Sequence, residues 1–164
     1  MKKLLSMACV IILVISVCSV SCLAEANVDE KNPSKLVSEN TEYYSDGSKI
    51  VTQIFEVDVV SSKGTITKSG TKTRTGYDSN NNVTCSFTVH GTFTVNTGVS
   101  ATCTSSTYTY STNGNGWSLK TASATKSGNS AIGTSTFVRK VLLITVDTLN
   151  LNCTLYCNKN GVLS

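Results

Sequence analysis

The sequence predicts an all-β protein, an antiparallel β-sandwich of about seven strands with an immunoglobulin-like architecture. Two observations support this prediction. The chain contains 24 threonines and a single proline, and threonine is a polar, β-branched residue that suits the solvent face of a strand. From Lys49 onward, apolar and polar residues also alternate with a period of two between turn-forming clusters of Asn, Asp, Gly and Ser.

The first 26 residues have the features of a secretory signal peptide. Lys2 and Lys3 form a short positive segment, residues 4–20 are almost wholly apolar, and the small residues Ala24 and Ala26 precede a plausible cleavage point. We therefore expect a bacterial-style export signal over residues 1–26 and a secreted, extracellular protein. Disulfides persist in that compartment.

Two forms of membrane attachment fit this segment less well. A transmembrane helix needs about 20 apolar residues, whereas the run here ends earlier, near Ser19 and Ser21, so no membrane span is expected. A lipid anchor on Cys22 is the minority alternative to free secretion. Lipoprotein sites usually carry Leu three residues before the cysteine, where this chain has Ser19.

The rest of the chain divides into two parts. Residues 27–48 are polar, charged and aperiodic, which is typical of a leader with little fixed structure. Residues 49–164 carry the period-two pattern, and their length suits one sandwich domain. The net charge of +4 is too small to indicate nucleic-acid binding, which usually accompanies a pI above about 9 and clustered Lys and Arg.

The strands of this domain can be followed from turn to turn. In the clearest one, residues 83–95, Phe87 and Val89 share one parity and the threonines share the other, so one face is expected in the core and one in water. The largely apolar stretch 131–146 is expected to form a single strand. The seven expected strands cover residues 49–60, 65–77, 83–95, 99–111, 117–125, 131–146 and 148–158.

Four cysteines follow the predicted signal peptide, and an even number in an exported domain implies two disulfides. Cys153 and Cys157 are four residues apart on one expected strand, which separates them by roughly 13 Å, beyond the ~7 Å limit between bridged Cα atoms. The expected hairpin also separates Cys85 from Cys103. Either Cys85 bridges Cys153 and Cys103 bridges Cys157, or the partners are exchanged. The spacing is not that of a zinc site.

The second half of the chain carries the motifs SFTVHGTFT at 86–94, TCTS at 102–105, WS at 117–118, ASATKSGN at 122–129 and CNKNGVLS at 157–164. These motifs resemble those of small secreted β-rich proteins of unknown function from Gram-positive gut bacteria of the Firmicutes type. In such proteins cysteines recur at the positions of Cys103 and Cys157. The resemblance therefore implies a bridge between these two residues, with a bridge between Cys85 and Cys153 as an addition of this chain. It implies no activity.

No constellation of residues indicates an enzyme. His90 is the only histidine and is expected on the solvent face of its strand, so neither a catalytic triad nor a multi-histidine metal site is predicted. Glu56, Asp58, Asp78 and Asp147 are the candidate acids for glycoside hydrolysis, but the first two share one wet strand face and no cleft is implied. We predict no catalytic residue, no metal site and no cofactor.

Aromatic residues near one turn form the best candidate binding site. Tyr108, Tyr110 and Trp117 flank the turn at residues 113–116 and are a possible platform for a ligand, although a tryptophan at such a position more often belongs to the core. The sequence therefore predicts a secreted, non-enzymatic module that binds an extracellular ligand, either a glycan, the cell wall or a protein. The alternatives are a secreted antagonist or toxin-like protein and a small hydrolase.

Overall fold

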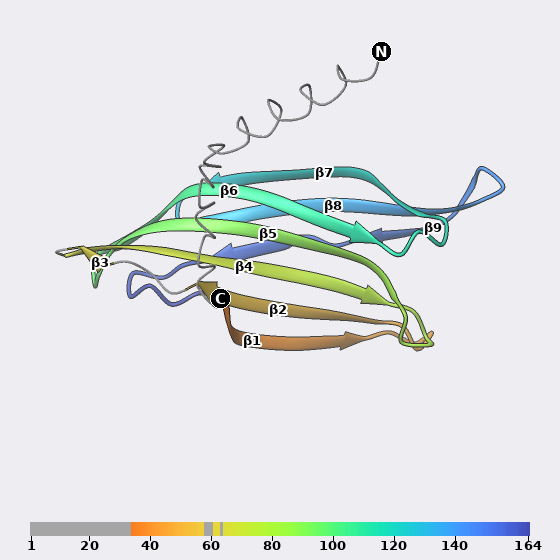
Figure 1. Cartoon of the computed structure of the whole chain (residues 1–164), viewed down its shortest axis with the longest axis horizontal. Coiled ribbons are helices and arrows are strands. Elements are labelled where there is room, and N and C mark those ends of the chain that lie inside the picture. Colours follow the sequence, from red (N-terminus) through yellow and green to blue (C-terminus); the bar gives the residue numbers. More distant parts are fainter. Residues whose placement is uncertain (1–33, 58–60, 63) are drawn as a thin grey trace, which may run out of the picture. The chain divides into compact units, whose positions relative to one another are not determined.

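The computed structural model describes residues 34–57, 61–62 and 64–164 (Figure 1). These residues form two antiparallel β-sheets and the turns that join their strands. Among them there is no helix long and apolar enough to cross a membrane. The predicted signal peptide and the alternative lipid anchor at Cys22 lie outside the described residues.

The first sheet is a meander that follows the chain. Its strands lie in the order β1-β2-β4-β5-β6, the short β3 pairs with β4, and every pairing is antiparallel. Neighbours in sequence pair because short turns rich in Gly, Asn and Ser join most of them. The strands are β1 (Ser34–Tyr43), β2 (Lys49–Val57), β3 (Ser61–Ser62), β4 (Thr65–Tyr77), β5 (Val83–Asn96) and β6 (Ser100–Thr112).

The second sheet is built around β8. One side of β8 pairs with β7, and the other side pairs first with β10 and then with β9. β9 and β10 thus form one strand that is broken at Leu151 and Asn152. At this break the Ser135 hydroxyl donates a hydrogen bond to the Leu151 carbonyl at 2.8 Å, and the Ser135 backbone N–H donates one to the Asn152 side-chain oxygen at 3.1 Å. The strands are β7 (Trp117–Ser127), β8 (Ser130–Val141), β9 (Ile144–Asn150) and β10 (Cys153–Tyr156).

The core lies between the two sheets. Phe87 and Phe93 of β5, Phe137 of β8 and Leu155 of β10 are fully buried in one hydrophobic cluster. Along most of β5, residues of one parity are buried and the polar residues between them are more exposed, which confirms the period-two prediction for this strand. The two sheets are held together by the removal of these apolar side chains from water.

The predicted all-β sandwich with antiparallel sheets is confirmed, and its chain order is simpler than that of an immunoglobulin domain. An immunoglobulin sandwich passes the chain between its sheets through Greek-key connections. Here β1 to β6 complete one sheet before β7 to β10 form the other. The described residues contain ten strands, counting the two-residue β3, instead of the seven expected.

Two predicted boundaries are wrong. Part of the expected leader, residues 34–43, forms β1 and pairs along β2; a mostly exposed edge strand needs no apolar alternation. The expected single strand 131–146 is two strands, because a two-residue turn at Leu142 and Leu143 separates Val141 from Ile144. That turn was not predicted because its type usually carries Asn-Gly.

The two predicted disulfides are also absent, since Cys85, Cys103, Cys153 and Cys157 are buried free thiols. The Cys103 thiol donates a hydrogen bond to the Ser105 carbonyl at 3.3 Å. The thiols of Cys153 and Cys157 approach backbone carbonyl oxygens at 3.8 and 3.6 Å. These cysteines therefore serve the fold as small, protonated core side chains.

Candidate functional site

A cleft of about 950 Å³ lies where the β1–β2, β4–β5 and β6–β7 turns meet β9. We call it the end cleft. It forms because each of these hairpins reverses at the same end of the sandwich, so turns far apart in the sequence become neighbours. Its lining is rich in aromatic, amide and charged side chains, among them Tyr44, Asp46, Lys49, Tyr77, Asp78, Asn80, Asn113, Asn115, Trp117, Arg139, Asp147 and Asn150.

Three side chains of the second sheet form a row across this cleft. Trp117 on β7 lies directly opposite Arg139 on β8, which in turn lies opposite Asp147 on β9. Directly opposed residues of antiparallel strands share a face. That face is the one toward the first sheet, because residues two positions along, such as Phe137 and Leu149, lie in or against the core. We call these three residues the cross-strand row.

The polar groups of this row are available to a ligand. Within the described residues, the Arg139 guanidinium makes no hydrogen bond or ion pair, although Asp147 is its cross-strand neighbour. One oxygen of Asp147 accepts the backbone N–H of Thr148 at 2.8 Å, and both charged side chains are exposed. Trp117 is half-buried, with part of its ring against the core and part on the cleft.

The first sheet supplies the opposite wall. The Lys49 ammonium lies 5.0 Å from the centre of the Tyr77 ring, a cation–π contact. Tyr44 also lines the cleft. Neither tyrosine was among the predicted binding residues. Each adjoins a turn, and turns that follow alternate strands of a meander meet at one end of the sheet.

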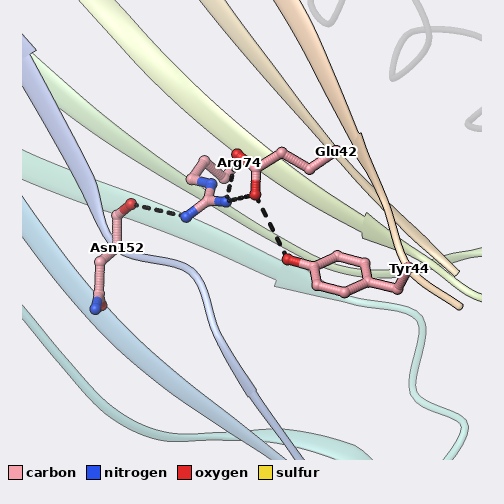
Figure 2. A network of polar contacts seen from close by, with 4 residues as sticks. All are labelled: Glu42, Tyr44, Arg74 and Asn152. Carbon is pink, nitrogen blue, oxygen red and sulfur yellow. Dashed lines mark hydrogen bonds and ion pairs between the residues drawn. The ribbon is translucent and has the colours of Figure 1, made fainter.

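A polar network holds Tyr44 and ties the sheets together (Figure 2). The Arg74 guanidinium of β4 donates to both carboxylate oxygens of Glu42, at 3.0 and 2.8 Å, and to the Asn152 carbonyl at 3.3 Å. The Tyr44 hydroxyl donates to the same carboxylate at 3.5 Å. Arg74 thus links β1 to the β9–β10 break of the second sheet.

Two carboxylates of the cleft accept hydrogen bonds from residues of their own turns. Asp46 accepts the Ser48 hydroxyl at 2.6 Å and its backbone N–H at 2.9 Å, and these bonds lower the pKa of its carboxyl. The Asn82 side chain and the backbone N–H groups of Asn82 and Asn80 lower the pKa of Asp78 in the same way. Both stay ionised, whereas a general acid for hydrolysis needs a raised pKa.

The four predicted acids are not brought together. Asp78 and Asp147 both line the end cleft. Glu56 instead forms an ion pair with Lys68 between β2 and β4. Asp58 lies outside the described residues.

The predicted aromatic platform is not assembled either. Tyr108 and Tyr110 lie on β6 and do not line the end cleft. Their rings approach those of the core residues Phe87 and Phe137, with centroids 5.6 and 6.2 Å apart. Of the three predicted rings, only that of Trp117 reaches the cleft.

His90 belongs to the outer face of the first sheet. One of its ring nitrogens lies 3.0 Å from the Thr109 hydroxyl of β6, and burial lowers its pKa. No cluster of three or more His, Cys, Asp or Glu side chains suited to a metal ion occurs among residues 34–57, 61–62 and 64–164.

Comparison of the chain with protein families, curated proteins and solved structures finds no match. The site is therefore interpreted from its own geometry.

Proposed function

We propose that the protein is an exported, non-enzymatic β-sandwich module that binds a glycan in the end cleft. The observation that supports this proposal is the cross-strand row, which aligns a half-buried indole ring, an unpaired guanidinium and an exposed carboxylate in one cleft.

Each member of the row suits a different part of a sugar. An indole face offers apolar area to the C–H face of a sugar ring with little loss of side-chain entropy. The Arg139 guanidinium provides a planar set of donors that matches hydroxyl pairs or the acidic groups of cell-wall glycans. Asp147 accepts hydroxyl hydrogens. The lining amides, such as Asn80 and Asn115, add donors and acceptors.

Binding fits the cleft better than hydrolysis. A glycosidase needs two carboxyl groups with different protonation states, and the Asp46 and Asp78 carboxylates are already used to stabilise turns with lowered pKa values. Asp147 uses one of its oxygens to accept the Thr148 backbone N–H, and its other oxygen remains for a ligand. The predicted bacterial export signal and the resemblance to secreted Gram-positive proteins are consistent with a cell-wall glycan as the ligand.

The proposal can be tested with a glycan and cell-wall polysaccharide binding screen. We expect the chain from Asn27 onward to bind at least one glycan, and Trp117→Ala to weaken that binding at least tenfold, since aromatic anchors dominate such sites. Arg139→Gln tests the row without touching the core and is expected to weaken binding too. Tyr156→Ala, at a 41% exposed ring outside the cleft, is the matched control. Unchanged affinity in both row variants would contradict the proposal.

A further inference from the structure

The β8–β9 hairpin ends in an exposed apolar tip formed by Val141, Leu142, Leu143 and Ile144. Their side chains are 52%, 91%, 94% and 68% exposed. Figure 1 shows this hairpin extending past the neighbouring turns at that end of the sandwich. Soluble proteins scatter single apolar residues over their surfaces, but a contiguous exposed apolar group usually marks an interaction site.

The backbone of the tip makes this choice of residues more unusual. Leu142 and Leu143 have φ angles of 48° and 70°, and Val141 pairs with Ile144, which is the geometry of a two-residue type I′ hairpin turn. Residues with a Cβ disfavour positive φ, and Asn-Gly is the preferred pair. The chain therefore exposes two leucines to water at φ angles that leucine disfavours, and the burial of neither side chain offsets this cost.

The shape of the tip indicates what receives it. A convex apex needs either a complementary apolar groove or a medium that closes around it. Two grooves of the described residues, the end cleft and the groove between β1, β2, β4 and β10, are lined mainly by polar side chains, so neither offers a second copy an apolar receptor. A bilayer accommodates a convex apolar apex without any preformed site.

The charge beside the tip fits the same surface. Lys140 directly precedes the apex and is exposed, so its ammonium can reach lipid phosphates while the leucines lie at the acyl boundary. We propose that the apolar tip anchors the protein to a phospholipid bilayer, with Leu142 and Leu143 inserted below the headgroups and Lys140 at the phosphate level. This anchoring does not depend on glycan binding, because Leu142, Leu143 and Lys140 do not line the end cleft.

Vesicle sedimentation tests the proposal. The chain from Asn27 onward is mixed with vesicles of phosphatidylcholine, or of phosphatidylcholine with phosphatidylglycerol. We expect binding to both and a roughly fivefold gain with the anionic lipid, the factor that about 1 kcal/mol per Lys provides. The double variant Leu142→Asn/Leu143→Gly is expected to lose binding at least tenfold. It retains the hairpin, because Asn-Gly is the preferred type I′ pair, and its thermal unfolding verifies this.

The control is Val99→Asn, which removes a 71% exposed apolar side chain from the β5–β6 turn and is expected to leave vesicle binding unchanged. Trp117→Ala should bind vesicles like the parent chain. Failure of the parent to bind either vesicle would overturn the proposal, as would full binding by the folded double variant. Self-association that the double variant abolishes, with no vesicle binding by the parent, would show that the tip receives a second copy and would also overturn it.

Discussion

Small residues decide how closely the sheets approach. A Cβ atom at Gly133 of β8 would lie 2.7 Å from the Phe87 ring of β5, and one at Gly91 of β5 would lie 3.0 Å from the Ala131 Cβ. Both distances are shorter than ordinary van der Waals contact. The side chain missing at Gly133 therefore makes the space that Phe87 of the other sheet fills, and the one missing at Gly91 lets β5 lie close to Ala131 of β8.

We expect Gly133→Ala to destabilise the fold by about 1 to 3 kcal/mol, the usual cost of overpacking a filled core. Urea unfolding gives this difference. Thr134→Ala, at the exposed neighbouring position, removes only a solvent-exposed hydroxyl contact with Ser123 at 2.8 Å and should cost about 0.5 kcal/mol. A Gly133→Ala variant as stable as the parent would show that Phe87 can move aside freely.

The buried thiols make stability depend on pH. Burial raises the pKa of Cys85 and of Cys153 from 9.0 to about 11. Below pH 9 both thiols are protonated in the folded and the unfolded chain, so their contribution to stability is fully present. Between pH 9 and about 11 only the unfolded chain releases these protons, so stability falls as the pH rises.

We expect the melting temperature to fall between pH 9 and 11, and to fall less steeply in the double variant Cys85→Ala/Cys153→Ala. The two chains share every other titratable group, so the difference between them isolates the thiols. Identical slopes would contradict the assignment of both cysteines as buried, protonated groups.

At the scale of elements, β1 shows that a strand can form without an apolar pattern. Its residues are mostly exposed, yet it pairs along β2 and supplies Glu42 to Arg74. Its backbone hydrogen bonds cover an edge of β2 that would otherwise be open to other chains.

A chain that begins at Lys49 should therefore be less stable and more prone to associate than one that begins at Asn27. It lacks the carboxylate that pairs with Arg74, and it exposes the β2 edge. Thermal unfolding and size-exclusion chromatography measure the two effects. Glu42→Gln weakens the ion pair but keeps β1, so it separates the loss of the ion pair from the exposure of the β2 edge. This variant should lower stability by about 1 kcal/mol or less and should not associate. Equal behaviour of the two chains would mean that β1 is dispensable.

The β8–β9 hairpin gives the opposite expectation, a variant more stable than the parent. Leu142→Asn/Leu143→Gly should raise the free energy of unfolding by about 1 to 3 kcal/mol, because it removes the cost of two leucines at positive φ. Leu142→Ala/Leu143→Ala keeps Cβ atoms at both positions and should show no such gain. Chemical denaturation compares the three chains, and a destabilised Asn-Gly variant would refute the strain argument.

Across the whole molecule, β8 connects the two proposed surfaces. Arg139 belongs to the cross-strand row and Lys140 adjoins the apolar tip, and the pairing with β9 shifts register between these two residues. The cleft and the tip therefore lie at the same end of the sandwich. A glycan held in the cleft and a bilayer at the tip would meet the protein from one side.

The two surfaces should nevertheless fail independently. Trp117→Ala is expected to lose glycan binding and keep vesicle binding. Leu142→Asn/Leu143→Gly is expected to keep glycan binding and lose vesicle binding. Each variant leaves the contacts of the other site unchanged. Measuring both ligands on both variants gives the comparison. Loss of both activities in a folded single variant would show one shared surface.

The sequence by itself determined the all-β class, most strand positions and the buried face of β5. These properties are local, because alternation along one strand already states which side chains leave water. The sequence could not show whether Trp117 serves as a ligand-binding platform or as a core side chain, since both roles need an aromatic ring on an inward face.

Only the tertiary structure decided where the functional groups meet. Trp117, Arg139 and Asp147 are joined by strand register, and Tyr44 and Tyr77 reach the same cleft because the hairpins of a meander reverse at one end. The turn at Leu142 and Leu143 could not be predicted from the sequence, because leucine disfavours the positive φ angles that both residues adopt. Cys85, Cys103, Cys153 and Cys157 are free thiols in the packed core, although their even number predicted two disulfides. Register, turn geometry and packing are long-range properties, so no single segment of the chain specifies them.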